Sequence, residues 1–123
     1  MDTTELIERY GAGERDFSGL DLTKAELSGV NLSGADLSQA NLSLARLNQA
    51  DLSGANLSQA NLSGAILQRA NLSQANLTGA DLSWADMGFA NLMDANLTDA
   101  NMQNTILIRA RLKGATMPDG TKR

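Results

Sequence analysis

The chain has 123 residues, enough for one small domain, and a formal net charge of −4 at pH 7. It contains no histidine and no cysteine, which excludes thiol and imidazole catalysis, the usual zinc ligand sets and disulfide bonds. Alanine and leucine supply 38 of the 52 apolar residues and only four residues are aromatic, so the core is predicted to be uniform, unlike the mixed, interlocking core of an ordinary globular domain.

The N-terminal segment, residues 1–14, is predicted to be a helical cap. Thr3 or Thr4 is expected to begin a short helix over residues 5–10, which Gly11 ends. Three apolar side chains of this helix are expected to cover the first part of the chain that follows: Leu6, Ile7 and Tyr10. Such a cap is needed if the rest of the chain is a solenoid, because solenoid ends expose apolar layers and unpaired backbone.

The first residues of the chain and its hydropathy indicate where in the cell the protein is expected. Residues 1–5 lack the basic start of a secretion signal. No apolar run approaches the roughly 18 residues of a membrane span. We therefore expect a cytoplasmic protein that does not contact a membrane.

From residue 15 to residue 117 the chain repeats every five residues, in 21 units. The central residue of the unit is leucine in 17 of them, and the residue two positions earlier is alanine in 17. Asparagine or aspartate stands between these two in 15 units. A mostly Ser/Thr position and a Gly/Gln-rich position follow, so the unit reads A-[ND]-L-S-x. An internal repeat of this kind outranks every other signal in a sequence.

A period of five residues fits neither regular element. In an α-helix the leucines would spiral around the axis, and in a flat strand they would alternate between the two faces. Within one unit, however, alanine and leucine are two residues apart and both can point inward. The two small or polar residues that follow suit a turn. The repeat therefore predicts a polygonal coil made of short edges and corners.

The exceptions to the consensus predict the number of edges. Six units lack Asn or Asp before the centre: Glu26, Arg46, Ile66, Ile106, Arg111 and Thr116. Four of these differ by multiples of 20 residues, and so do four of the exceptions one place after the centre, Asn48, Gln68, Gly88 and Ile108. Four units of five residues per coil explain both columns. The chain is therefore predicted to form a square coil with a little over five turns.

These units resemble the pentapeptide-repeat family. The resemblance rests on segments such as 35–39 (ADLSQ), 55–59 (ANLSQ) and 75–79 (ANLTG), and it extends over residues 15–117. It implies an all-β solenoid, a right-handed quadrilateral β-helix. The lead-in from Leu6 to Phe17 is also similar to the start of many cyanobacterial members.

The C-terminal end differs from the N-terminal one. Residues 118–123 form a polar tail that is too short to cover the last apolar layer, which contains Leu107, Leu112 and Met117. We expect a homodimer through this end, which the family resemblance also implies; the alternative is a monomer whose last coil frays. The five basic residues after residue 104 are interpreted as a solvated terminus, because they lack interleaved aromatics, and no direct nucleic-acid binding is predicted.

One face of the predicted coil departs from the polar consensus. Its columns bring together apolar, aromatic and arginine side chains, the residue types of a binding patch: Arg46, Ile66, Arg69, Trp84, Phe89, Ile106, Ile108 and Arg109. Arg69, Phe89 and Arg109 are expected to lie one coil apart and to stack as cation–π pairs. The alternative interpretation is that this face only stabilises neighbouring coils through cross-strand pairs.

The repeat offers no catalytic, metal-binding or cofactor-binding constellation. Stacked aspartates such as Asp16 and Asp36 occupy the consensus Asn/Asp position and are interpreted as structural. The sequence therefore predicts a non-catalytic scaffold that binds an unidentified protein partner. The family resemblance implies an alternative, a DNA mimic that binds DNA gyrase and protects it from quinolones, although that role needs a longer and more negative rod.

Overall fold

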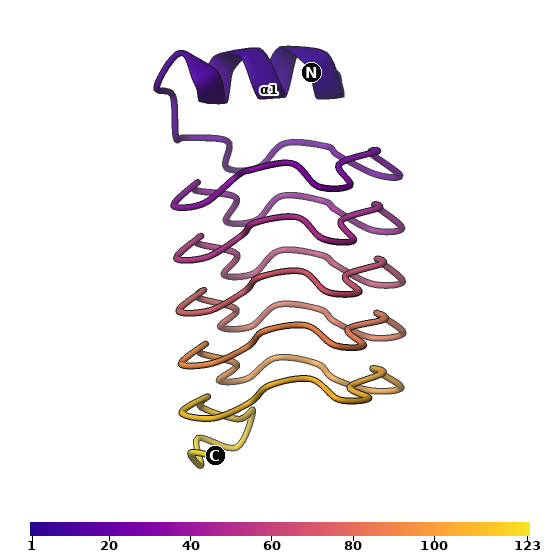
Figure 1. Ribbon diagram of the computed structural model, residues 1–123, viewed down its shortest axis with the longest axis vertical. Coiled ribbons are helices and arrows are strands. Elements are labelled where there is room, and N and C mark those ends of the chain that lie inside the picture. Colours follow the sequence, from indigo (N-terminus) through magenta and orange to yellow (C-terminus); the bar gives the residue numbers. More distant parts are fainter.

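The computed structural model describes residues 1–123 as one helix, a stack of coils and a short tail (Figure 1). The helix α1 (Thr3–Gly11) lies across the N-terminal end, and the tail lies beneath the last coil. No named strands occur, because each edge of a coil contributes a single bridge residue. α1 is too short and too polar to cross a membrane.

The coils are four-sided, as the spacing predicts. Every parallel bridge joins a residue to the one 20 positions later, from Asp16 with Asp36 to Asn96 with Thr116. A step of 20 residues equals four units, so each unit supplies one edge and one corner. The number of units per coil, inferred from the exceptions to the consensus, is thereby confirmed.

Backbone hydrogen bonds explain how one unit builds an edge and a corner. The N–H of Leu37 donates to the carbonyl oxygen of Asn56 at 2.7 Å, and the N–H of Asn56 donates to that of Ala35 at 2.9 Å. The N–H of Ala40 closes the corner by donating to Leu37 at 3.1 Å. A turn of this kind needs a positive φ at its third residue, and that position is left-handed in every unit from Gly19 to Gly114.

The Asn/Asp position has a structural role that the repeat pattern alone does not reveal. In each of the units that carry it, the side-chain Oδ1 accepts the backbone N–H of the residue two positions later, as Asp36 does from Ser38 at 3.0 Å. We call this contact the Asx cap. Because it satisfies a donor at the start of each corner, the cap explains why the consensus requires Asn or Asp here. It also explains why these side chains are half-buried in the middle of the stack.

The core consists of the inward leucines and alanines. The centres from Phe17 to Leu97 are all buried, and so are the alanines from Ala35 to Ala100. In the first coil the inward residues Leu20, Ala25 and Val30 are only half-buried. The apolar burial predicted from the repeat is therefore present in every coil except at the two ends.

α1 begins earlier than predicted. Asp2, and neither Thr3 nor Thr4, is its N-cap, because the Asp2 carboxylate accepts the N–H of Glu5 at 2.8 Å. Aspartate is as good an N-cap as serine and better than threonine. The helix therefore has three more residues than the predicted 5–10, two at its start and Gly11 at its end.

α1 covers the first coil with one face. Leu6 is fully buried, whereas Ile7 is 43% exposed, so the prediction that both side chains cover the coil is wrong for Ile7. Tyr10 donates its hydroxyl hydrogen to the carbonyl oxygen of Ser33 at 2.6 Å. The guanidinium of Arg15 stacks on the Tyr10 ring at 3.7 Å. In later coils the carbonyl oxygen equivalent to that of Ser33 accepts an N–H of the preceding coil. Ser33 has no such coil before it, so the Tyr10 hydroxyl replaces the missing donor.

The C-terminal tail folds back onto the last edge. Lys122 forms an antiparallel bridge with Thr116, and the N–H of Arg123 donates to Ala115 at 2.9 Å. The N–H of Met117 donates to Thr121 at 2.7 Å. The tail, predicted only as a polar extension, therefore supplies backbone partners for one edge, next to the buried Ala115.

Three aspartates at the ends of the stack make stability depend on pH. The pKa values of Asp16, Asp21 and Asp119 are held below the usual 3.8, because a hydroxyl and a backbone N–H two residues later both donate to each carboxylate. A pKa lowered by folding contributes stability above the unfolded pKa, and that contribution is lost as pH falls through the lower folded value.

We therefore expect the free energy of unfolding to decrease below about pH 4. A variant with all three aspartates replaced by asparagine retains the Oδ1 acceptors and is expected to show a flatter dependence in this range. Urea unfolding at a series of pH values measures the difference. Parallel curves for the two proteins would contradict the assignment.

Candidate interaction face

One edge of each coil, with its two flanking corners, forms what we call the variant face. The edge residues come from segments 26–28, 46–48, 66–68, 86–88 and 106–108, which the 20-residue bridges stack in register. The preceding corner contains Leu44, Gly64 and Trp84, and the following corner contains Arg69, Phe89 and Arg109. All eight residues predicted for the candidate patch therefore lie on one side of the stack.

Exposed apolar side chains are concentrated on this face. The large apolar residues that are exposed within the repeats all belong to it: Leu44, Trp84, Phe89, Ile106 and Ile108. Trp84 is 69% exposed and Ile108 is 66% exposed. The only other exposed ones, Met1 and Ile7, precede the coils. Ile66 is half-buried, so it forms part of the floor of the patch.

Three of these residues occupy corner positions that a large side chain disfavours. Leu44, Trp84 and Phe89 have φ values of 58°, 62° and 59°. The left-handed region costs a non-glycine residue about 1–2 kcal/mol. The ladder on both sides of the corner holds the backbone there, so the side chains project outward from a fixed frame. Their presence is not required by the turn, which glycine satisfies elsewhere.

The predicted cation–π stack forms in part. The Arg69 guanidinium lies 4.6 Å from the centre of the Phe89 ring. Arg109 lies one coil further along the same column but makes no such contact, so the prediction is wrong for Arg109. The difference fits the direction in which corner side chains lean: those of Leu44, Gln59 and Asp94 lie against the next coil toward the C-terminus. Arg69 leans onto Phe89 in this way, whereas Arg109 leans away from it.

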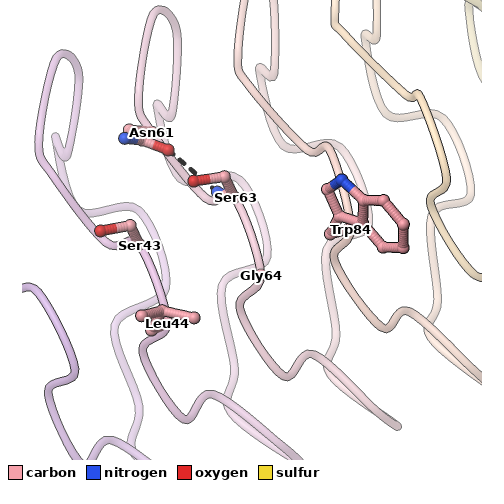
Figure 2. Close-up of a pocket in the computed structure, with 6 residues that line it drawn as sticks. All are labelled: Ser43, Leu44, Asn61, Ser63, Gly64 and Trp84. Atoms are coloured by element: carbon pink, nitrogen blue, oxygen red, sulfur yellow. Dashed lines mark hydrogen bonds between the residues drawn. The ribbon is translucent and has the colours of Figure 1, made fainter.

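A shallow notch of about 430 Å³ opens at the preceding corner (Figure 2). Gly64 forms its floor because it lacks a side chain between Leu44 and Trp84. The Leu44 side chain lies over Gly64, so that a Cβ on this glycine would come within 2.8 Å of a Leu44 methyl group. Ser43, Ser63 and Asn61 form the polar wall. Trp84 belongs to the patch predicted from the sequence, whereas Gly64, whose absent side chain creates the notch, was not predicted.

The acidic groups on the variant face are already engaged. Glu26 accepts the Ser28 hydroxyl at 2.6 Å and lies 3.7 Å from Arg46. Asp86 accepts the N–H of Gly88 at 3.1 Å and the side-chain amide of Gln68 at 2.7 Å. The positive charges of Arg69 and Arg109 have no ion-pair partner in the chain.

The stacked aspartates have structural roles. Asp16, Asp36, Asp81 and Asp86 each form an Asx cap with the residue two positions later. Nowhere do three or more carboxylates gather in a group that could hold a metal ion.

The C-terminal end leaves backbone and apolar groups open on three edges. Leu107, Leu112 and Met117 are half-buried, in contrast to the fully buried centres of the middle coils. Five N–H groups of the ladder between coils find no acceptor in the last coil, those of Met102, Asn104, Leu107, Arg109 and Leu112. In earlier coils the same groups bond the coil that follows. The exposed edge is therefore equipped to pair with another chain.

These observations define a β-solenoid with a capped N-terminal end and one non-consensus face. The family model for pentapeptide repeats matches residues 16–54, 55–88 and 90–119 in eight copies. The chain therefore belongs to the pentapeptide-repeat family. No curated protein matches it significantly by sequence.

Solved structures show the same architecture. The cyanobacterial pentapeptide repeat protein alr5209 from Nostoc PCC 7120 is 36% identical, with a TM-score of 0.67 over 91% of this chain and 96% of that one. A pentapeptide repeat protein from the Arabidopsis thaliana thylakoid lumen is 33% identical, with a TM-score of 0.58 over 92% and 72% of the two chains. Both support the predicted right-handed quadrilateral β-helix.

A third structure shares the fold alone. QnrB1, a plasmid-mediated fluoroquinolone resistance protein, is 21% identical, with a TM-score of 0.53 over 81% of this chain. The match spans only 59% of the QnrB1 chain. At 21% identity, this similarity shows a shared fold and carries no statement about function.

Proposed function

We propose that the protein is a non-catalytic scaffold that binds another protein through the variant face. The observation that carries this proposal is the gathering of every exposed large apolar side chain of the repeats on that one face. Patches of this composition, with arginine among aromatic and aliphatic residues, are typical of protein interfaces.

The alternative interpretation, stabilisation between coils, requires apolar partners in adjacent coils. Trp84 stands between Gly64 and Asn104 in its column, and Leu44 stands between Lys24 and Gly64. These exposed residues therefore lack the cross-strand apolar neighbours that would stabilise a sheet. Among the exposed large apolar side chains, Phe89 alone has a side-chain partner of this kind, Arg69. Polar pairs such as Glu26–Arg46 and Gln68–Asp86 also link adjacent coils, but they do not involve these exposed residues. The binding role is therefore favoured by Trp84 and Leu44, which have no apolar neighbour in their column.

Capture of partners from a lysate tests the scaffold role. A variant with Ile66, Phe89 and Ile106 replaced by serine is expected to recover at least about tenfold less partner than wild type, because interface anchors of this size contribute more than 1 kcal/mol each. Circular dichroism should show both proteins equally folded. A matched variant with Thr78 and Thr98 replaced by alanine, on the opposite face, should capture the partner normally. Equal recovery by all three would remove the variant face from the proposal.

The DNA-mimic alternative is less well supported by the surface. A mimic of duplex DNA needs a strongly negative rod, whereas this chain has a net charge of −4 and places arginines along the variant face. We expect no inhibition of gyrase supercoiling, and no protection from a quinolone, at micromolar protein. Inhibition or protection at that concentration would favour the mimic over the scaffold.

The proposal includes a homodimer through the C-terminal end and a cytoplasmic location. The dimer is supported by the open N–H groups and half-buried apolar residues of the last coil. The location is testable by cell fractionation, and recovery from a membrane-enclosed lumen, the setting of the Arabidopsis relative, would contradict it.

A further inference from the structure

The variant face presents backbone donors that the chain itself leaves without an acceptor. On the other faces, an Asx cap satisfies the N–H of the residue after the centre in nearly every unit. On this face Arg46, Ile66 and Ile106 replace the capping residue. The N–H groups that consequently have no acceptor in the chain belong to Asn48, Gln68 and Ile108.

Each of these donors has an arginine close by in the sequence and in the column. Arg46 occupies the capping position before Asn48, Arg69 directly follows Gln68, and Arg109 directly follows Ile108. The N–H of Ser28, on the same face, also has no acceptor, but the Glu26 carboxylate two residues earlier lies within 2.6 Å of the Ser28 hydroxyl and disfavours an anion there. Near these arginines the face has three open N–H groups and two guanidinium groups without an ion-pair partner, those of Arg69 and Arg109, while Arg46 lies 3.7 Å from Glu26. Because the carboxylates of the face are engaged, this arrangement attracts an anion.

We propose that the variant face binds an acidic segment of a partner protein, whose aspartate or glutamate oxygens take the place of the missing Asx caps. The inference rests on the proposed scaffold function and adds the chemistry of the partner. Carboxylates accept hydrogen bonds from Asn48, Gln68 and Ile108, and the arginines neutralise their charge. Ile66, Phe89 and Trp84 pack against apolar side chains of the same segment.

A carboxylate fits this site better than a phosphate. Every acceptor that caps the corresponding N–H elsewhere in the chain is the Oδ1 atom of aspartate or asparagine, so the corner geometry suits a planar carboxyl or amide group. The net charge of −4 also opposes a polyanion such as nucleic acid. A short acidic segment, by contrast, needs only the local positive charges.

Amide proton shifts of the full chain test the proposal directly. The peptide is an acetylated and amidated decamer of alternating glutamate and leucine, and the control peptide contains glutamine in place of glutamate. Titration with the acidic peptide is expected to move the amide protons of Asn48, Gln68 and Ile108 downfield and to saturate. The amides of Ser58 and Thr78, which are capped on the opposite face, should not move. Absence of saturable shifts, or equal shifts with the glutamine peptide, would overturn the proposal.

Restoring one cap provides a matched variant. Ile66→Asn supplies an Oδ1 for the N–H of Gln68 and is expected to weaken binding of the acidic peptide about tenfold while raising the urea midpoint. Arg111→Asn is the control: it supplies an Oδ1 for the open N–H of Lys113, outside the variant face, and should bind within about twofold of wild type. Unchanged binding by Ile66→Asn would contradict the missing-cap mechanism. If duplex DNA shifts the same amides more strongly than the peptide does, the ligand of the face is nucleic acid and the acidic-segment proposal is wrong.

The outcome separates this inference from the scaffold proposal. If the lysate partner is lost from the Ile66, Phe89 and Ile106 serine variant but the acidic peptide moves no amide, the face binds a partner of different chemistry. If the serine variant also captures the partner normally, the scaffold face itself is wrong.

Discussion

Replacement of Leu67 by alanine is expected to lower the free energy of unfolding by about 2–5 kcal/mol. Leu67 is fully buried, and its neighbours along the stack, Leu47 and Met87, are fully buried as well. The coils that carry these three residues are joined by a ladder of backbone hydrogen bonds, which fixes the distance between them. The coil therefore has little freedom to collapse into the cavity, and the loss should fall in the upper part of the range.

Leu44→Ala is the matched control, because the same side chain is removed from an exposed corner. Leu44 is 53% exposed and contacts the surface of Gly64 rather than the core. We expect a change within about 0.5 kcal/mol. Urea unfolding followed by circular dichroism measures both variants. Similar losses at the two positions would mean that the inward leucines do not carry the stability of the stack.

Loss of the dimer is the second large effect. Wild-type protein is expected to elute with twice the 13.0 kDa mass of one chain, and a variant with Leu112 and Met117 replaced by glutamate should elute as a single chain. Both residues are half-buried at the end of the stack, where unpaired N–H groups of the last coil also lie. Charged side chains there oppose the burial of the apolar layer against a second copy.

Lys113→Glu serves as the control for this experiment. Lys113 is exposed in the same coil but does not belong to the apolar layer. The control should retain the dimer, and light scattering gives the mass of all three proteins. Circular dichroism reveals any variant in which the last coil unfolds. A wild-type mass of one chain would contradict the C-terminal dimer outright.

The parts of the fold that repeat could be predicted from the sequence. The five-residue period identifies the inward leucines and alanines. The spacing of the departures from the consensus gives the 20-residue step, because 21 units define what the consensus is. The two ends could not be predicted in the same way. Asp2 replaces the expected threonine cap, and Lys122 pairs with Thr116, through contacts that occur once in the chain.

The candidate site shows the same division. Columns follow from the repeat, so Ile66, Phe89 and Ile106 fall on one face as predicted. The direction in which a side chain leans depends on side-chain packing between coils, which the pattern does not contain. That is why the contact of Arg69 with Phe89 forms while the one expected for Arg109 does not. The Asx caps also escaped prediction, because an outward polar residue need not bond its own backbone.

The four-sided coil has a consequence for insertions and deletions. Five additional residues after Thr78 would leave every later leucine pointing inward, but would rotate all later outer residues by a quarter-turn. Phe89 and Ile106 would then leave the face that carries Ile66, while the core continued undisturbed. Twenty additional residues would lengthen the rod and preserve its columns. Insertions of one unit therefore preserve the core, whereas only insertions of four units preserve the columns of outer residues.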